Sequence, residues 1–331
     1  MLAVKCKLTD AEKIRKKLIK IGLYDFSRLP KKESDSIYFP VLKKVKEYTV
    51  IDTALDSKRE NKNVHYYLKN KLPQATIDSI PRAMDIVGDI AIIELQGLSK
   101  KEELIIGNAV MEAHKQIKVV CKKAGFHEGE YRTRKLEVIA GENRKETTYL
   151  ENGVRIKLNA ETCYFSPRLS NERIRIARLI KPKETVLVMF SGVGPYSLVI
   201  SKNSKAKEIY AIEINPEAHK YALENTEKNK LKNIHSYQGD VNKVLPTLKK
   251  RFDRIIMPLP KDAIDFLTLA LKYCKKNGSI HLYDFEKEDD IPKEVKKKIK
   301  SRFKNVKILK IIKCGQYSPG KYRICVDMKL L

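Results

Sequence analysis

The residues best suited to chemistry form a glycine loop and an acidic position that follows it. The loop Gly192-Val193-Gly194-Pro195 ends an apolar run that starts at Val186, and a helical segment follows it. Glu213 ends a second apolar run, at about the 20-residue spacing of an acid that accepts hydrogen bonds from ribose hydroxyls. A tight turn between strand and helix that binds no ligand is the alternative.

Pro195 and Asp240 indicate which nucleoside the loop binds. Free N–H groups at a helix start bind the pyrophosphate of a dinucleotide, but Pro195 removes one of those donors. Asp240 follows a third apolar run, where its carboxylate can accept a hydrogen bond from an adenine amino group. A nucleoside without phosphates fits best, so S-adenosylmethionine is the expected cofactor.

The apolar runs around these residues predict a parallel α/β sheet. Helical segments separate strands expected near 185–190, 208–214, 234–240, 252–257 and 278–284. No helix fits between two last β-rich runs, 306–312 and 322–328, so these are expected to pair as an antiparallel hairpin. A parallel sheet with a reversed strand at its end is the fold of Rossmann-like class I methyltransferases.

Two smaller parts precede this domain. Residues 1–62 are expected to form a small α/β module that ends in a linker, because the stretch from Asp56 to Asn63 has no apolar residue. Residues 63–165 form an α+β domain, in which Asn152-Gly153 predicts a hairpin turn. Residues 166–331 are the cofactor domain. The first module is interpreted as a second grip on a long substrate, or as a decoration packed on the main body.

Composition indicates a polyanionic partner. Lys and Arg number 68 against 41 Asp and Glu, which gives a net charge of +27. RNA or DNA is the natural partner of such a chain, although lysine-rich faces that are only solvated are the alternative. No apolar run is long enough to span a bilayer and no leader is recognisable, so a cytoplasmic protein is expected. The six cysteines are scattered without metal-binding spacing, so no metal site is expected.

A chemically dense segment lies directly before the cofactor domain. From Tyr164 to Arg173 it combines an aromatic residue, two arginines and a carboxylate. Ser166-Pro167 favours an extended turn, and a helix beginning near Ser170 puts Glu172 in its first turn. A salt-bridged glutamate at a helix start is the alternative to a catalytic one.

With this segment the sequence resembles a known family, the archaeal and eukaryotic tRNA (guanine-37-N1) methyltransferases. The matching stretches are 85–89, 131–137, 140–144, 164–168 with Glu172-Arg173, and 190–195. The resemblance implies a module that grips the tRNA elbow, a middle RNA-binding domain and an S-adenosylmethionine domain. It implies methylation of N1 of the guanosine 3′ of the anticodon. No metal is needed, because the sulfonium of the cofactor is already an activated methyl donor, and a monomer is expected.

The resemblance also implies roles for single residues. Glu172 matches the general base that removes the N1 proton, and Arg132 matches the arginine that stabilises the charge on O6. Residues implied to contact the cofactor are Tyr164, Arg173, Phe190, Gly192, Val193, Gly194, Pro195, Glu213, Ile214, Asp240, Val241 and Pro258. Residues implied to contact the substrate are Arg132, Arg134, Tyr164, Arg168, Pro258 and Pro260.

The sequence departs from the family pattern at two places. Val188 stands where the family often has aspartate, so a cofactor contact there is lost or supplied elsewhere. Pro258-Leu259-Pro260 replaces a motif that usually starts with asparagine. An asparagine side chain can donate a hydrogen bond to the guanine edge, and proline cannot. This variant resembles an archaeal branch, some of whose members also methylate C7 of the wyosine precursor 4-demethylwyosine.

Two other functions stay open. The related wyosine-pathway enzyme transfers the aminocarboxypropyl group of the same cofactor, and Glu172 after the Ser-Pro-Arg motif favours methyl transfer instead. A tRNA-binding module with a degenerate cofactor fold is the non-enzymatic alternative, for which Val188 is the only argument.

Overall fold

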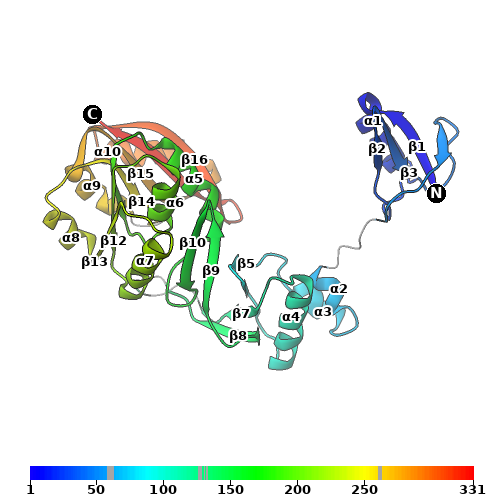
Figure 1. The fold of residues 1–331 in the computed structure, drawn as a ribbon, viewed down its shortest axis with the longest axis horizontal. Coiled ribbons are helices and arrows are strands. Elements are labelled where there is room, and N and C mark those ends of the chain that lie inside the picture. The colour runs from blue at the N-terminus through cyan, green and yellow to red at the C-terminus, as the bar shows by residue number, and fades with distance from the viewer. Residues whose placement is uncertain (58–62, 126–128, 130, 132, 260–262) are drawn as a thin grey trace. The chain divides into compact units, whose positions relative to one another are not determined.

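The computed structural model describes residues 1–331 apart from 58–62, 126–128, 130, 132 and 260–262. The described chain forms two compact units, Met1–Tyr66 and Tyr67–Leu331 (Figure 1). Each unit encloses hydrophobic clusters of its own.

The first unit packs one helix on a small antiparallel sheet of order β2-β3-β1-β4. Its strands are β1 (Leu2–Lys7), β2 (Lys31–Glu33), β3 (Ser36–Pro40) and β4 (Val50–Asp52). The 3₁₀ turn η1 (Leu8–Asp10) leads into helix α1 (Ala11–Lys20). Leu18 of α1 is fully buried in one cluster with Val4 and Phe39. This unit is the small α/β module that the sequence predicts.

The second unit begins with a four-stranded sheet of order β5-β6-β7-β8, in which only β6 and β7 are parallel. Its strands are β5 (Asp85–Val87), β6 (Ile90–Ile93), β7 (Val119–Lys123) and β8 (Leu136–Gly141). Helices of this part are α2 (Val64–Leu68), α3 (Gln74–Ser79) and α4 (Lys100–Ala113). Ser99 and Glu102 cap the start of α4 reciprocally. The region is α+β, as expected.

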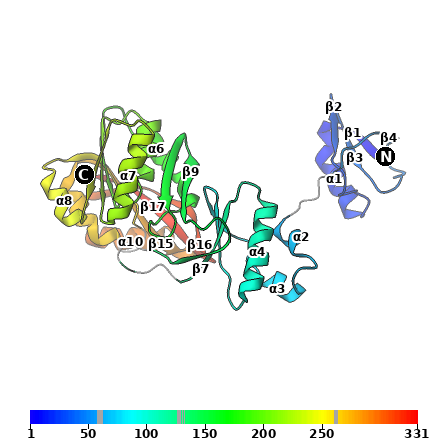
Figure 2. The same cartoon turned by 60° about the horizontal axis from the view of Figure 1, so that its bottom comes forward.

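A hairpin of β9 (Glu146–Glu151) and β10 (Val154–Asn159) follows. Asn152 and Gly153 both have positive φ, 45° and 80°, as a two-residue hairpin turn requires. Val154, Ile156 and Leu158 are buried in the same cluster as residues of the cofactor domain. Figures 1 and 2 show the hairpin beside α6 and α7. The expected boundary at residue 165 therefore cuts through a shared core, and the functional division into three parts stays a prediction.

The cofactor domain has a seven-stranded sheet of order β13-β12-β11-β14-β15-β17-β16. The strands are β11 (Thr185–Met189), β12 (Glu208–Glu213), β13 (Ile234–Gln238), β14 (Phe252–Met257), β15 (Cys274–Lys287), β16 (Val306–Ser318) and β17 (Lys321–Leu330). The first five are parallel, and β17 runs antiparallel to both β15 and β16. This confirms the predicted Rossmann-like sheet with a terminal antiparallel hairpin.

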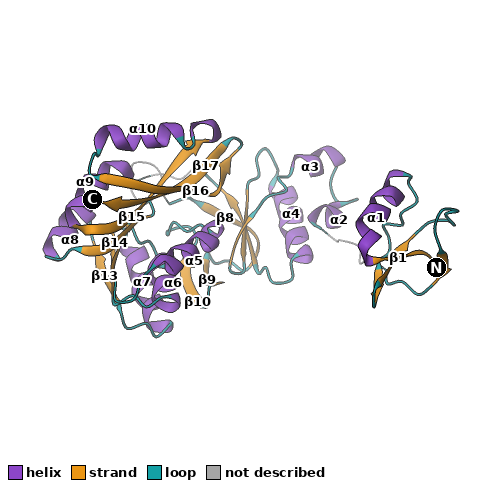
Figure 3. Ribbon diagram, turned by 90° about the horizontal axis from the view of Figure 1, so that it is seen from above, coloured by secondary structure: helices purple, strands orange, loops and turns teal. Residues whose placement is uncertain are grey.

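Helices cover both faces of this sheet (Figure 3). Along β11, Val186 and Val188 face one hydrophobic cluster while Leu187 and Met189 face the other, because successive side chains alternate across a strand. The first cluster includes helices α5 (Ser170–Leu179), α6 (Pro195–Asn203) and α7 (Pro216–Lys228). The second includes α8 (Val241–Thr247), α9 (Leu267–Tyr273) and α10 (Lys293–Arg302). The 3₁₀ turns η2 (Pro167–Leu169), η3 (Ala263–Phe266) and η4 (Glu288–Asp290) complete the domain.

Candidate active site

The glycine loop forms the predicted turn between β11 and α6. Gly192 and Gly194 have φ values of +56° and +86°, which glycine adopts without a Cβ clash. Pro195 is the first residue of α6, and Gly194 is its N-cap. Phe190 also has a positive φ of 58°, and its ring packs edge-on against Phe266 with centroids 4.9 Å apart. The backbone of the loop is therefore bent at three positions within five residues.

Glu213 closes this loop from the end of the neighbouring strand β12. Its carboxylate accepts hydrogen bonds from the backbone N–H of Gly192 at 2.6 Å and of Asn215 at 2.9 Å. The residue is buried, and burial raises the pKa of its carboxyl group above the usual glutamate range. Each oxygen keeps a lone pair for a further donor, so the side chain can hold the loop and accept from a ribose.

The other predicted cofactor residues lie at the same edge of the sheet. Strands β13, β12, β11 and β14 are consecutive neighbours. Glu213 ends β12, while Asp240, the loop and Pro258 follow the carboxyl ends of the other three. Asp240 is the N-cap of α8, and its Oδ1 accepts from the backbone of Asn242 at 2.9 Å. Val241 is buried, while Ile214 and Pro258 are half-buried. The sheet thus gathers four strand ends at one edge, which is where open α/β sheets bind ligands.

Val188 does not reach this edge. Its side chain is fully buried in the cluster beneath α5 and α6. A carboxylate at this position would have to be buried among apolar side chains, so the valine agrees with the packing around it.

Tyr164 is held by an arginine that the sequence analysis missed. Arg323 of β17 donates to the hydroxyl of Tyr164 at 2.8 Å, and its guanidinium lies 5.1 Å from the ring centroid of Phe285. Arg168 pairs with Asp85 of β5 at 2.7 Å. The segment before α5 is therefore tied to the last strand of the sheet and to the sheet of the middle region.

Arg173 is buried and binds the hairpin. Its guanidinium pairs with both carboxylate oxygens of Glu151, one of them at 2.6 Å. It also donates to the backbone carbonyl of Ser166 at 3.2 Å and lies over the ring of Phe165. These contacts use most of its donors, so the cofactor contact implied by the resemblance stays a prediction.

Glu172 is buried in the first turn of α5 and accepts three hydrogen bonds. Arg175, one turn later, donates to Oε2 at 2.6 Å and to Oε1 at 2.7 Å. The hydroxyl of Tyr283 donates to Oε1 at 2.6 Å. The salt bridge of a glutamate at a helix start, which is the alternative to a catalytic role for Glu172, is thus present. Among these three bonds Oε2 accepts the one from Nε of Arg175, which leaves it a lone pair for a proton.

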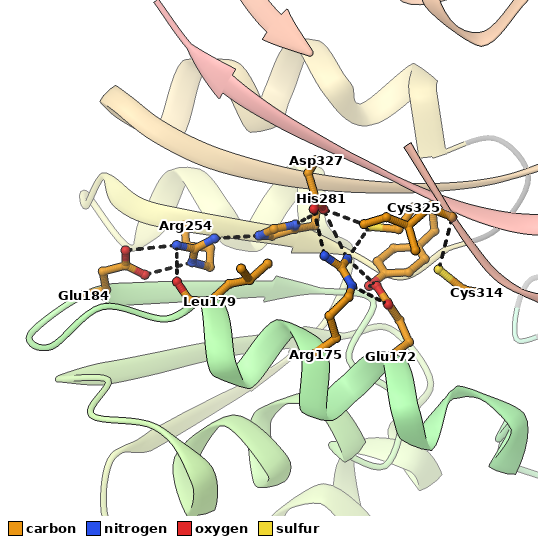
Figure 4. A network of polar contacts seen from close by, with 11 residues as sticks. Glu172, Arg175, Leu179, Glu184, Arg254, His281, Cys314, Cys325 and Asp327 are labelled. Atoms are coloured by element: carbon orange, nitrogen blue, oxygen red, sulfur yellow. Dashed lines mark hydrogen bonds and ion pairs between the residues drawn. The ribbon is translucent and has the colours of Figure 1, made fainter. Parts of the chain in front are cut away.

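The Glu172 ion pair continues into a buried polar chain across the sheet (Figure 4). Arg175 also pairs with Asp327 at 2.7 Å, and Asp327 contacts Nδ1 of His281 at 2.6 Å. Nε2 of His281 lies 2.7 Å from Arg254, which pairs with Glu184. Since a guanidinium only donates, Nε2 must accept and Nδ1 must carry the proton. Burial lowers the pKa of His281, in agreement with a neutral ring.

The same chain contains three potential metal ligands, His281, Cys325 and Asp327, whose ligand atoms lie within 4.8 Å of one another. Two guanidinium groups, of Arg175 and Arg254, already bind this cluster, and their positive charges disfavour a cation there. Burial alone would raise the pKa of Asp327, but hydrogen bonds from His281 and Arg175 outweigh it and lower the pKa. The cluster is explained by hydrogen bonds within the protein.

Two predicted residues, Arg132 and Pro260, lie outside the described residues, so their predicted contacts with substrate stay predictions. Arg134 is half-buried, and its Nε has no hydrogen-bond partner among the described residues. Among the helices that the structure describes, none has the length and apolar content needed to cross a bilayer.

Comparison with known proteins agrees with this geometry. Residues 147–311 match the model of the TRM5/TYW2 methyltransferase domain, residues 64–144 the TYW2 N-terminal domain and residues 3–49 the tRNA methyltransferase 5 N-terminal domain. The chain is 38% identical to a tRNA (guanine(37)-N(1))-methyltransferase Trm5b of Pyrococcus abyssi, over 99% of both chains. The crystal structure of that protein covers 100% of this chain and 99% of its own, with a TM-score of 0.76.

Two further relatives are informative. A tRNA (guanine(37)-N(1))/4-demethylwyosine(37)-methyltransferase Taw22 of Nanoarchaeum equitans is 34% identical over 75% of this chain and 99% of its own. The structure of a Trm5 protein, aTrm5, in complex with tRNALeu is 28% identical, covers 100% of both chains and has a TM-score of 0.73. The chain therefore belongs to the TRM5/TYW2 family of methyltransferases, as the resemblance of its motifs predicted.

Proposed function

We propose that the chain uses S-adenosylmethionine to methylate N1 of guanosine-37 in tRNA, acting as a cytoplasmic monomer. The observation that carries the proposal is the position of Glu172 on α5, which packs against α6, the helix that the glycine loop begins. Tyr196, two residues after Gly194, packs its ring on Tyr283 with centroids 5.8 Å apart, and Tyr283 donates to Glu172. A buried carboxylate therefore lies close to the helix that the cofactor loop begins.

The proposed chemistry starts with the proton on guanine N1, which blocks attack until a base removes it. Glu172 takes this proton at the free lone pair of Oε2. Arg132 stabilises the negative charge that then develops on O6. The bound cofactor supplies a sulfonium methyl group, whose S–C electron pair stays on sulfur as the new N1–C bond forms. The products are N1-methylguanosine and S-adenosylhomocysteine.

The cofactor residues have distinct roles in this proposal. Glu213 accepts from the ribose hydroxyls while it holds Gly192. Asp240 accepts from the adenine amino group with the oxygen that does not cap α8. The residues proposed to enclose the rest of the cofactor are Tyr164, Arg173, Phe190, Val193, Pro195, Ile214, Val241 and Pro258.

Transfer RNA is the proposed partner because charge and family agree. The net charge of +27 suits a polyanion, and one relative was solved in complex with tRNALeu. Arg134 and Arg168 are proposed to contact the substrate next to Arg132 and Pro260. The first unit is proposed to grip the tRNA away from the target base.

Methylation of C7 of 4-demethylwyosine is a second candidate. Pro258-Leu259 offers no side-chain donor to the guanine edge, and the name of the Nanoarchaeum equitans relative includes this activity. Aminocarboxypropyl transfer is the rival reaction of the family. The match of residues 3–49 to the tRNA methyltransferase 5 N-terminal domain favours methyl transfer.

Analysis of the product nucleoside tests the proposal. The purified chain is incubated with labelled cofactor and tRNA transcripts that carry G or A at position 37. Mass analysis of digested G37 tRNA should show N1-methylguanosine, and the A37 transcript should stay unlabelled. A product heavier by an aminocarboxypropyl group would show that the chain transfers this group instead of a methyl group. Cofactor binding without any modified nucleoside would favour a non-catalytic tRNA-binding module.

A further inference from the structure

The polar chain behind Glu172 contains an imbalance of charge that the proposed reaction uses. Arg175 pairs with two carboxylates at once, Glu172 and Asp327. At the far end, Arg254 and Glu184 pair with each other, and the neutral His281 separates the two halves. The group Glu172–Arg175–Asp327 therefore holds one positive and two negative charges. It becomes neutral when Glu172 accepts one proton.

We propose that Asp327 and Tyr283 are positioning residues that set the proton affinity of Glu172 from opposite directions. The negative charge of Asp327 offsets part of the positive charge that Arg175 presents to Glu172, and so keeps this carboxylate more basic than Arg175 alone would. Tyr283 donates a hydrogen bond to the ionised carboxylate and so limits its basicity. This inference rests on the proposed role of Glu172 as the base that accepts the N1 proton.

The contacts of Arg175 show how its charge is divided. Its Nη1 donates to Asp327 at 2.7 Å and its Nε donates to Glu172 at 2.6 Å, while Nη2 contacts both residues at 3.2 and 2.7 Å. Without Asp327, the full charge of Arg175 would stabilise the ionised carboxylate of Glu172 and make it a poor base. Since Asp327 holds the other side of the same guanidinium, the pair stays balanced after Glu172 is protonated.

Other groups around Glu172 do not supply this balance. Four neutral side chains face it from the surrounding elements, namely Tyr196, Tyr283, Cys314 and Cys325. Burial raises the pKa of each of these groups, which keeps them uncharged at neutral pH. Arg173 is balanced by its own partner, Glu151. Among the charged residues that the structure describes, Arg175 contacts Glu172 directly and Asp327 holds the other side of Arg175.

His281 fixes Asp327 in the position that this division requires. Its Nδ1–H donates to Oδ1 of Asp327, and its Nε2 accepts from Arg254. Asp327 and His281 are also paired across the antiparallel strands β17 and β15. Arg254 in turn donates to the backbone carbonyl of Leu179 at 2.8 Å, at the end of α5. The sheet therefore holds the helix of Glu172 at both ends.

A pH series on single variants tests the inference. Single-turnover methylation of G37 tRNA is measured at saturating cofactor for wild type, Asp327→Asn, Tyr283→Phe and Glu184→Gln. In Asp327→Asn the acid limb of the rate profile should move to lower pH by about one unit, with a lower plateau. In Tyr283→Phe it should move to higher pH. Glu184→Gln removes a carboxylate from the far arginine, so its acid limb should stay at the wild-type position.

Opposite shifts distinguish tuning from structural damage, because a loosened helix moves both variants in the same direction. Cofactor affinity and thermal unfolding report the folding of each variant, and Tyr283→Phe carries the test alone if Asp327→Asn does not fold. Unshifted limbs in both variants, or a Glu184→Gln shift as large as that of Asp327→Asn, would overturn the inference. Glu172→Gln in the same series separates the two proposals. If Glu172→Gln reacts as fast as wild type, the assignment of Glu172 as the base is wrong. If Glu172→Gln is slow but the acid limb of Asp327→Asn stays at the wild-type pH, only the inference about Asp327 and Tyr283 is wrong.

Discussion

Glu213 and Glu172 are two buried carboxylates in one domain, and their partners differ in kind. Glu213 accepts from the uncharged backbone N–H groups of Gly192 and Asn215. Glu172 accepts from a guanidinium and a phenol. Backbone N–H groups are fixed in place and uncharged, so they cannot compensate a change in the charge of Glu213. The Glu213 region is therefore suited to binding. The side chains around Glu172 belong to a network of charged groups that can balance the change in charge when Glu172 accepts a proton, so this region is suited to chemistry.

The largest effect should come from Glu172→Gln. The amide keeps the shape but cannot accept the N1 proton, so kcat should fall by about 10²–10⁴-fold with little change in cofactor affinity. Residual activity should rise with pH, since solvent then deprotonates the guanine. Single-turnover rates over a pH series provide the measurement.

Glu103→Gln is the matched control for this variant. Glu103 is also buried and paired with a lysine, Lys122, at 2.6 Å, but it lies on α4 in the middle region. It should retain nearly the wild-type kcat. If Glu172→Gln retains the wild-type kcat as this control does, Glu172 serves only as a partner in a structural ion pair. The contrast between a binding carboxylate, Glu213, and a catalytic one, Glu172, would then be wrong.

The next effect is on cofactor binding. Glu213→Ala removes both the proposed acceptor of the ribose hydroxyls and the bond to Gly192, so the cofactor Kd should rise about 10–100-fold, as the loss of charged hydrogen bonds predicts. The affinity for tRNA should change little. Calorimetric titration with cofactor and a filter-binding titration with tRNA measure the two. Equal weakening of both ligands would argue against a ribose-binding role.

The sequence predicted the fold better than it predicted the site. Apolar runs alternating with helices determine a parallel sheet, and the missing helix before residue 322 determines the reversed strand. The position of Glu213 beside the loop was predictable because a βα unit spaces it from Gly192, while its contact with ribose stays a prediction. These features depend on residues that are near one another in the chain, where periodicity and turn chemistry are readable.

The missed contacts join residues that are far apart in the chain. Arg323 contacts Tyr164, and Asp327 contacts Arg175, although each pair is separated in the sequence by more than half the length of the domain. No spacing rule connects such pairs, because only the order of strands in the sheet brings them together. For the same reason the sequence left open whether Glu172 is a base or an ion-paired residue, because its partners Arg175 and Tyr283 are brought together only by the fold.

A smaller effect separates the two carboxylates by pH. Burial raises the pKa of Glu213, so its contribution to folding stability is greatest at low pH and is lost as the pH rises through the raised pKa. The proposed contact of Glu213 with the ribose hydroxyls uses the ionised form, so cofactor binding should show the opposite trend. The Kd should therefore rise as the pH falls from neutral towards the ordinary glutamate range. Calorimetry on wild type and Glu213→Gln tests this. The variant should bind more weakly but without this pH dependence, and a flat wild-type curve would contradict the assignment.

The smallest effect concerns Asp240, a third carboxylate at the same edge that is half-buried and serves a helix start. Its Oδ1 caps α8 through the backbone N–H of Asn242. Asp240→Asn should keep this cap and lose the adenine amino group as a donor partner, so the Kd for cofactor should rise a few-fold at nearly unchanged stability. Asp240→Ala should lose the cap as well, which costs about 1 kcal/mol and lowers the Tm by about 2–4 °C. Calorimetry and thermal unfolding on both variants measure these effects. If Asp240→Asn binds cofactor as wild type does while Asp240→Ala is destabilised, Asp240 only caps α8, and Glu213 is the carboxylate of this edge that the cofactor needs.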